Sequence, residues 1–104
     1  MGFIAVYITH PSMREARRVV NHLLEKRLIA CANLFPVKSL YRWKGRVENS
    51  SEVVSIVKTR RGNWSRLKSE VGRIHGYEVP CIMKLNAEAN DAYERWVESE
   101  TKRA

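Results

Sequence analysis

The order in which hydrophobic periodicity changes along the chain is the feature that most constrains its fold. Phe3 to Thr9 is almost entirely apolar and rich in β-branched residues, which predicts a strand covered on both faces. From Met13 to Leu28 the apolar residues recur at three- and four-residue steps with basic residues between them, which predicts an amphipathic helix. A second strand, helix and strand series follows, and a short helical segment ends the chain. The predicted order is therefore βαββαβα.

The middle of the chain predicts a long β-hairpin. Cys31 to Val47 is extended in pattern, and Pro36 places this strand at a sheet edge because proline cannot donate a ladder hydrogen bond. Gly45 marks the approach to a polar turn expected at Glu48–Ser51. Glu52 to Thr59 then returns as an interior strand with apolar residues on both faces.

Capping residues predict where the helices begin and end. Short polar side chains satisfy free backbone amides at a helix N-terminus, and glycine favours the left-handed conformation after a C-terminus. The expected assignments are capping boxes at Ser12/Glu15 and Asp91/Glu94, an N-cap at Asn63, a C-cap at Gly76 and a fourth strand over Val79 to Leu85.

This order of elements predicts an α+β fold, the ferredoxin-like βαββαβ sandwich, with a C-terminal helix added. Its antiparallel four-stranded sheet has helices on one face and an extended hairpin, in one domain over residues 1–104. The topology puts the second and fourth strands at the edges, in agreement with Pro36. Two edges and one face stay uncovered, so we expect a second copy of the chain to cover them.

Charge raises nucleic acid as a partner, and the strand pattern argues against it. Nineteen Lys and Arg against eleven Asp and Glu leave a net charge of +8. An RNA-binding sheet of this fold stacks bases on aromatic residues of its first and third strands, and the third strand here, Val53 to Lys58, contains none. The basic residues are also scattered along the sequence. We therefore expect the charge to form a solvated, ion-paired surface.

The cellular compartment is predicted from features that the sequence lacks. Its apolar runs fall far short of the ~18 residues that cross a bilayer, and no secretory leader opens the chain, so no membrane partner is expected. Cys31 and Cys81 match neither a disulfide framework nor a paired metal clip. Both observations favour a reducing cytoplasm.

The sequence contains no catalytic motif, so an enzyme is not expected. Its thiols and imidazoles are the ligand types that copper and zinc prefer, although free cysteines are usually buried apolar residues. His75 differs from the others because it belongs to a tight cluster, His75 to Pro80, between a helix and a strand. Helix-dipole stabilisation of a C-terminal histidine is the alternative explanation. The remaining candidate ligands are Cys31, Cys81, His22 and His10. We expect His22 to lie at the surface or at the edge of the core, and a local hydrogen bond is enough to explain the presence of His10.

This cluster and the segment Arg27 to Asn33 resemble the CutA family of divalent-cation tolerance proteins. The family's Leu-Ala-Ala-Cys-x-Asn, Ser-x-Tyr-x-Trp-x-Gly, Glu-Val strand, Lys-Thr, His-Pro-Tyr-Glu-x-Pro and closing Tyr-x-x-Trp are met in order over almost the whole chain. The matching residues are Ala30, Cys31, Asn33, Pro36, Ser39, Tyr41, Trp43, Gly45, Glu52, Val53, Lys58, Thr59, His75, Tyr77, Glu78, Pro80, Tyr93 and Trp96.

The resemblance implies a homotrimer, similar in architecture to PII-type signalling proteins, that confers tolerance to copper and other divalent cations without enzymatic activity. The chain departs from the family at four points: Ile8 replaces a cysteine found in some members, Ile74 replaces one of two adjacent histidines found in many, Gly76 replaces the proline, and Cys81 replaces a common glutamate. Of the copper site proposed for the family, only His75 carries over directly.

We therefore expect a homotrimeric metal-response protein that binds copper or another divalent ion weakly through His75, Glu78 and Cys81. The alternative is a PII-like signalling or scaffold module that binds a small anionic metabolite in inter-subunit clefts, favoured by the basic residues Lys58, Arg60 and Arg61. Further candidates for the cleft are Tyr77, Lys58, Cys31 and Trp43.

Overall fold

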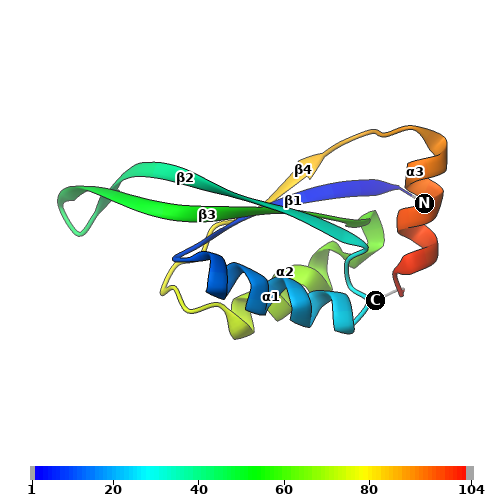
Figure 1. Cartoon of the computed structure of the whole chain (residues 1–104), viewed down its shortest axis with the longest axis horizontal. Helices are drawn as coiled ribbons and strands as arrows, with labels where there is room; N and C mark the ends of the chain where they lie inside the picture. The colour runs from blue at the N-terminus through cyan, green and yellow to red at the C-terminus, as the bar shows by residue number, and fades with distance from the viewer. Residues whose placement is uncertain (1, 103–104) are drawn as a thin grey trace.

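The computed structural model describes residues 2–102 and has the predicted order of elements (Figure 1). Its four strands form one antiparallel sheet in the order β2-β3-β1-β4. This confirms the α+β fold and places β2, with Pro36, at one edge and β4 at the other. The elements are β1 (Phe3–His10), α1 (Met13–Glu25), β2 (Cys31–Trp43), β3 (Arg46–Arg60), the 3₁₀ turn η1 (Arg61–Asn63), α2 (Trp64–Ile74), β4 (Ile82–Asn86) and α3 (Asp91–Glu100).

The core lies between one face of the sheet and helices α1 and α2 (Figure 1). Ile4, Val6 and Ile8 alternate along β1 and are fully buried, as the two-residue period of a strand requires. Leu23 of α1 and Leu67 of α2 are buried against the same face. Each such side chain stabilises the fold by about 1.5–3 kcal/mol relative to exposure. Within the described part of the chain, no helix is long and apolar enough to cross a membrane.

The predicted caps are met in part. The hydroxyl of Ser12 accepts a hydrogen bond from the Glu15 amide at 3.2 Å, as predicted, and the Glu15 carboxylate accepts from Arg18 Nε at 2.9 Å. The predicted Asp91/Glu94 box is wrong by one position, because Asn90 is the N-cap of α3 and Glu94 accepts from the Ala89 amide.

The predicted ends of α2 are met in part. Asn63 is the N-cap, as predicted, although its side chain makes no capping bond; its buried amide nitrogen donates to Thr59 Oγ1 and to the carbonyl of Lys102. The C-cap at Gly76 is wrong: His75 ends the helix with extended backbone, and Gly76 has no positive φ. The chain leaves α2 directly in an extended path, so no left-handed residue is needed.

The hairpin turns earlier than the sequence predicts. Lys44 and Gly45 are the two turn residues, with φ of 49° and 80°, which is the positive-φ pair that matches strand twist in a two-residue hairpin. The turn expected at Glu48–Ser51 is wrong, because those residues pair with β2 inside β3. β4 begins at Ile82 rather than at Val79.

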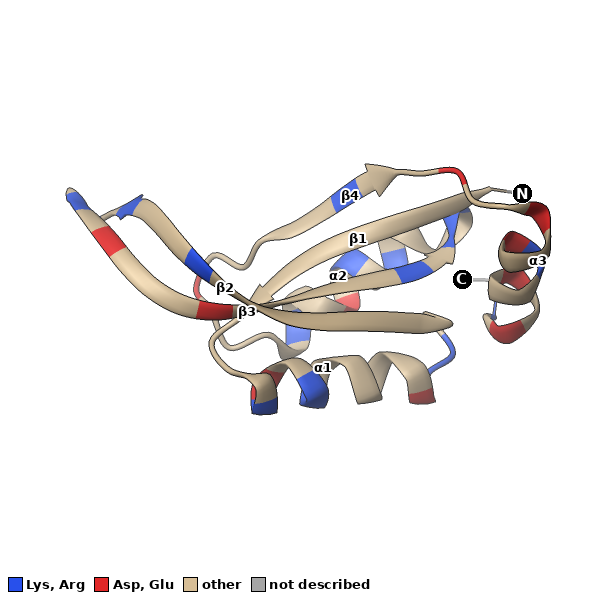
Figure 2. Ribbon diagram, turned by 45° about the horizontal axis from the view of Figure 1, so that its top comes forward, with Lys and Arg blue, Asp and Glu red and all other residues tan. Residues whose placement is uncertain are grey.

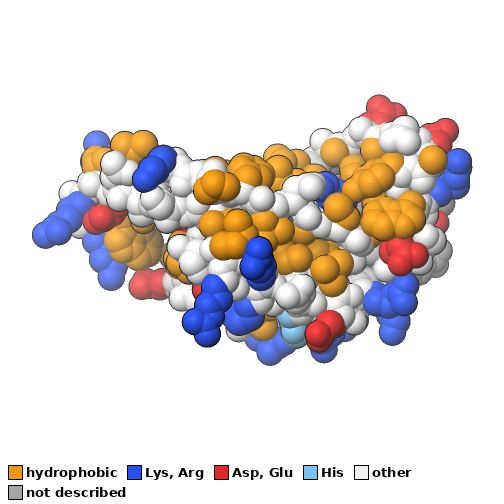
Figure 3. All heavy atoms as spheres, viewed as in Figure 1, with side chains coloured by type: hydrophobic (Ala, Val, Ile, Leu, Met, Phe, Trp, Pro, Cys, Tyr) orange, Lys and Arg blue, Asp and Glu red, His pale blue; other side chains and the backbone are white. Residues whose placement is uncertain are grey.

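Two parts of the sheet lack a covering layer. β1 ends where His10 pairs with Val53, so β2 and β3 continue past it as a two-stranded overhang (Figure 1, left). The face opposite α1 and α2 is open except at the end occupied by α3. Figure 3 shows hydrophobic side chains gathered over the sheet, and Phe35, Met83 and Leu85 remain 37%, 46% and 38% exposed.

Charge is distributed unevenly over the elements. Lys and Arg lie on the hairpin, α1, α2 and β4, and acidic residues lie on α3, with others on β3 of the hairpin and on α1 (Figure 2). The basic residues therefore form no single stripe along the described surface, in agreement with the expectation from sequence.

Candidate functional site

A groove of about 800 Å³ opens between the overhanging hairpin and the segment that precedes β4. One wall is the outer half of β2 with Glu52 of β3, and the floor reaches Thr9 at the end of β1. The other wall is the segment 77–81, which follows α2. The lining residues are Thr9, Lys38, Ser39, Leu40, Tyr41, Arg42, Trp43, Glu52, Tyr77, Glu78, Val79 and Cys81.

His75 supports the groove from behind, with both ring nitrogens occupied. Its Nε2 lies 2.7 Å from the carbonyl oxygen of Thr9, and its Nδ1 accepts from the Tyr77 amide at 3.0 Å. A carbonyl oxygen can only accept, so Nε2 carries the proton. The ring is therefore in one neutral tautomer and positions Tyr77.

His10 lies stacked against His75, with ring centroids 5.3 Å apart and planes 18° apart. It is fully buried, and its Nε2 lies 2.8 Å from Ser55 Oγ. The expected local hydrogen bond is therefore wrong, since Ser55 is on β3. Among the described residues, Nδ1 of His10 has no partner. Burial, reinforced by His75, lowers the pKa of His10 to about 4, so the imidazole of His10 is neutral at pH 7.

Tyr77 and Glu52 are joined across the groove. The Tyr77 hydroxyl donates to Glu52 Oε2 at 2.6 Å, and burial together with this carboxylate raises the pKa of Tyr77. Burial and the charge of Glu52 also raise the pKa of the Cys81 thiol. Cys81 is thus protonated at neutral pH, and a metal ion would have to displace its proton to bind.

The structure brings some of the predicted site residues together and separates others. Trp43, Tyr77, Glu78 and Cys81 line the groove, whereas His75 lies behind it. No three His, Cys, Asp or Glu side chains of the described residues are grouped closely enough to hold a metal ion. Sequence reasoning did not include Glu52 in the site. The sequence feature that could have identified Glu52 is that it is a single carboxylate at the start of the predicted apolar strand Glu52 to Thr59.

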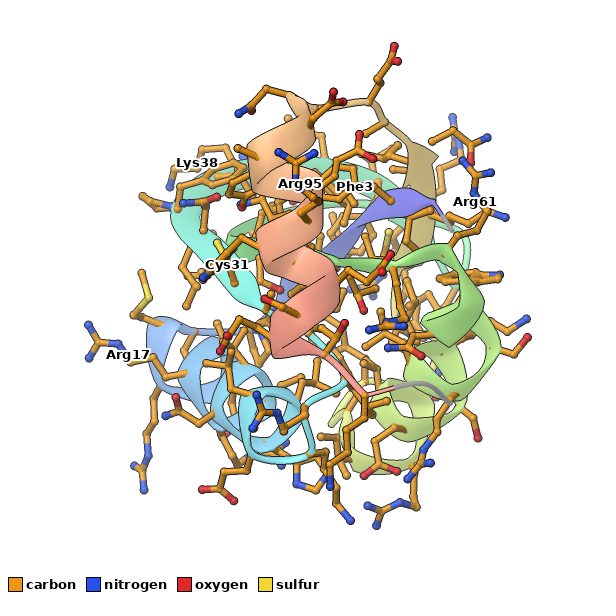
Figure 4. The ribbon with its side chains drawn as sticks, turned by 90° about the vertical axis from the view of Figure 1, so that its right-hand side faces the viewer. Phe3, Arg17, Cys31, Lys38, Arg61 and Arg95 are labelled. Carbon is orange, nitrogen blue, oxygen red and sulfur yellow. The ribbon has the colours of Figure 1, made fainter. Side chains whose placement is uncertain are left out.

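Cys31 lies at the opposite end of the sheet, beside α3 (Figure 4), and Lys58 is its partner in the β2–β3 register. Lys58 Nζ is 3.7 Å from Cys31 Sγ and donates to Asn33 Oδ1. The Tyr93 hydroxyl is 3.5 Å from the same sulfur, and burial with this contact raises the pKa of Tyr93 to about 12. These residues form a cluster of their own, separate from the groove.

The other basic residues of β3 also lie outside the groove. Arg60 Nε donates to Thr101 Oγ1 at 3.0 Å, and its Nη2 donates to the carbonyls of Glu98 and Thr101. Arg60 therefore fastens the C-terminus of α3 to the sheet. Arg61 is exposed beyond the strand.

His22 joins the two core helices. Its Nε2 hydrogen-bonds Glu70 Oε2, and Glu70 also accepts from Arg73 Nη2 at 2.8 Å. The bonds from Arg73 and His22 lower the pKa of Glu70 to about 2. His22 therefore has a structural partner and lies apart from the groove.

Comparison with known proteins identifies close relatives. The sequence model of the family described as CutA1 divalent ion tolerance protein matches residues 4–100. The divalent-cation tolerance protein CutA of Pyrococcus horikoshii is 42% identical over 101 residues, covering 96% of this chain and 99% of the relative.

Solved structures agree with this match. A mutant of CutA1 from Pyrococcus horikoshii has a TM-score of 0.94 at 42% identity, covering 96% of this chain and 99% of that one. The PII-like protein CutA from Nostoc, in its apo form, has a TM-score of 0.91 at 29% identity, covering 97% and 99%.

Proposed function

Because this chain belongs to the CutA1 divalent ion tolerance protein family, we propose that it is a divalent-cation tolerance protein that binds copper or another divalent ion weakly and catalyses no reaction. The observation that carries the proposal is the groove, which gathers a thiol, two carboxylates and a phenol from β3 and from the segment 77–81. The thiol is a ligand for soft and borderline ions such as copper and zinc, and the carboxylates are ligands for harder divalent ions.

The proposed ligands are Cys81, Glu78 and His75. They fit copper in chemical type, but the described residues do not preassemble them in one coordination shell. His75 would have to exchange its bond from the Tyr77 amide for the metal. Rearrangement and loss of the Cys81 proton both cost free energy, which is why the proposed affinity is weak.

We propose a homotrimer as the working unit. The uncovered sheet edges, the exposed face with Phe35, Met83 and Leu85, and the hairpin overhang support it. A neighbouring copy would also supply further side chains to a groove that has too few ligands. Light scattering at three times 12.1 kDa, about 36 kDa, is the expected result, and a monomer would contradict this proposal.

Copper titration by calorimetry tests the site. We expect the heat of binding to fall strongly in His75→Ala and Cys81→Ser, and to stay unchanged in His22→Ala, whose imidazole is bonded to Glu70 between the core helices. Equal heats in wild type and His75→Ala would refute the ligand assignment.

The second candidate is a PII-like module that binds a small anionic metabolite. Lys38 and Arg42 on the groove wall favour it, and one structural relative is described as PII-like. Lys58 and Arg60 give it no support, since both are engaged at the α3 end. A thermal-shift screen with nucleotides tests it, because a ligand that binds the folded state raises the melting temperature. No stabilisation by any nucleotide would argue against it.

For location we propose the cytoplasm, on the cysteine spacing that suits a reducing compartment. Fractionation of cells that express the full chain tests this, and recovery outside the cytoplasmic fraction would contradict it.

A further inference from the structure

The cluster at the α3 end of the sheet contains a thiol and an amine held face to face. Cys31 and Lys58 are directly opposite each other in the β2–β3 register, so both side chains leave the same face of the sheet. Lys58 Nζ lies 3.7 Å from Cys31 Sγ, and Asn33 Oδ1 accepts from the same amine. The Tyr93 hydroxyl approaches the sulfur from α3 at 3.5 Å. Two donors thus converge on one sulfur.

The surroundings restrict which partners can reach this sulfur. Cys31 and Lys58 are half-buried, and Tyr93, which contacts Cys31, packs against Phe3 and Trp96 at centroid distances of 6.0 and 5.7 Å. A small oxidant fits such a site better than a bulky thiol such as glutathione. Of the two groups that contact this sulfur, the Lys58 amine is the stronger nucleophile, because the raised pKa of the nearer Tyr93 hydroxyl keeps that group protonated.

The second cysteine of the chain is out of reach. Cys31 pairs with Lys58 of β3, and Lys58 pairs in turn with Ala5 of β1. Cys81 precedes Ile82, which pairs with Ile8 on the other side of β1. The two positions differ by roughly four residues along the strands, about 13 Å, and by most of the sheet width as well. A disulfide requires Cα atoms within about 7 Å, so one chain cannot form it.

We propose that Cys31 and Lys58 form an oxidative modification site, in which hydrogen peroxide drives a sulfenamide cross-link between β2 and β3. The proposal rests on this cluster and is independent of metal binding in the groove. Condensation of a sulfenic acid with a nitrogen is established thiol chemistry.

The reaction has two balanced steps. The Cys31 thiol first loses its proton to solvent, and the thiolate attacks one peroxide oxygen, so that the S–O bond forms as the O–O bond breaks. Sulfur loses two electrons, and the departing hydroxide takes up a proton from solvent to become water. The deprotonated Lys58 amine then attacks the sulfur, and the N–S bond forms as the S–O bond breaks. The second hydroxide leaves with a proton from nitrogen. Thiol, amine and peroxide thus yield sulfenamide and two waters.

Intact mass spectrometry of the full chain in a Cys81→Ser background tests the proposal, since this background removes any disulfide of the same mass change. After brief peroxide treatment in mildly alkaline buffer, we expect a species lighter by two hydrogen atoms, which a thiol reductant converts back. Tryptic digestion should join the peptides 28–38 and 47–60, because modified Lys58 is not cleaved. This readout on the linked peptide needs no substitution in the cluster.

Two variants separate Lys58 from other amines. Lys58→Arg keeps the positive charge but lacks the amine, and we expect it to lose the cross-link and gain oxygen atoms on Cys31 instead. Lys68→Arg is the matched control, since Lys68 lies on α2 over Trp64, and it should cross-link like its parent. Oxygen addition without loss of hydrogen in the parent, or an unchanged yield in Lys58→Arg, would overturn the proposal.

Discussion

The two ends of the open sheet face carry different chemistry and are closed in different ways. At the hairpin end, Tyr77, Glu52 and Cys81 line a groove and two stacked histidines lie behind it. At the other end, α3 covers Cys31 and Lys58. The side chains proposed to bind a metal ion therefore lie at the end of this sheet face that no helix covers.

Their anchoring differs as well. Arg60 fastens α3 to the sheet through three hydrogen bonds, so the α3 end is held by the partly buried side chain of the last residue of β3. The groove wall is held by three hydrogen bonds: His75 Nε2 donates to the Thr9 carbonyl, the Tyr77 amide donates to His75 Nδ1, and the Tyr77 hydroxyl donates to Glu52. The comparison predicts that acid loosens the groove end and that loss of Arg60 loosens the α3 end.

Acidification should produce the largest effect, through His10. Its folded pKa of about 4 lies below the unfolded value of 6.5, so the unfolded chain binds the proton more tightly in this interval. Stability is therefore complete above pH 6.5 and falls as the pH drops towards 4, by about 3 kcal/mol. Urea unfolding between pH 7 and 4 measures it.

The control for this prediction removes the imidazole. His10→Gln, which keeps a donor near Ser55, should lose most of the slope, whereas His22→Gln should retain it. The low pKa of Glu70 acts only at lower pH, since its contribution is lost from 4.5 towards 2. A wild-type slope equal to that of His10→Gln would contradict the assignment.

Arg60→Ala should cost about 2 kcal/mol, because it leaves the carbonyls of Glu98 and Thr101 without their donor at a partly buried position. Urea unfolding at pH 7 measures this free energy. Arg61→Ala is the matched exposed control and should change stability by less than about 0.5 kcal/mol. Similar losses in the two variants would show that α3 does not depend on Arg60.

Tyr77→Phe should cost about 1.5 kcal/mol, since it removes one hydrogen bond to a charged carboxylate at the groove. Tyr41→Phe removes a longer, exposed bond to Ser50 and should cost at most ~0.5 kcal/mol. The two melting curves compare them directly. If Tyr41→Phe proved the costlier, the Tyr77–Glu52 contact would not be what holds the groove wall.

The smallest effect tests the hairpin turn. Gly45→Ala should destabilise by about 1 kcal/mol, because φ of 80° is unfavourable for any residue with a Cβ. Gly72→Ala, inside α2 with open space around it, should stabilise by about 0.5–1 kcal/mol. Thermal unfolding of both variants should therefore give shifts of opposite sign, and shifts of the same sign would refute the turn assignment.

Local signals predicted the element order well and the element ends poorly. Pro36 identified an edge strand because a missing N–H is a property of the residue itself. The polar run at Glu48–Ser51 suggested a turn, yet it pairs within β3, because Lys44 and Gly45 supply the turn geometry. Asn63 likewise occupies the predicted N-cap position, but its side chain makes no capping bond and its amide nitrogen donates to the C-terminal segment.

The sequence by itself determined the fold class, the edge strands and the family, because periodicity, proline chemistry and ordered motifs are carried by residues close together in the chain. Only the tertiary structure decided that His75 supports the groove, that Glu52 belongs to it and that Cys31 lies against Lys58. These are contacts between distant segments. Strand register and the packing of α3 set them, and neither can be read from neighbouring residues.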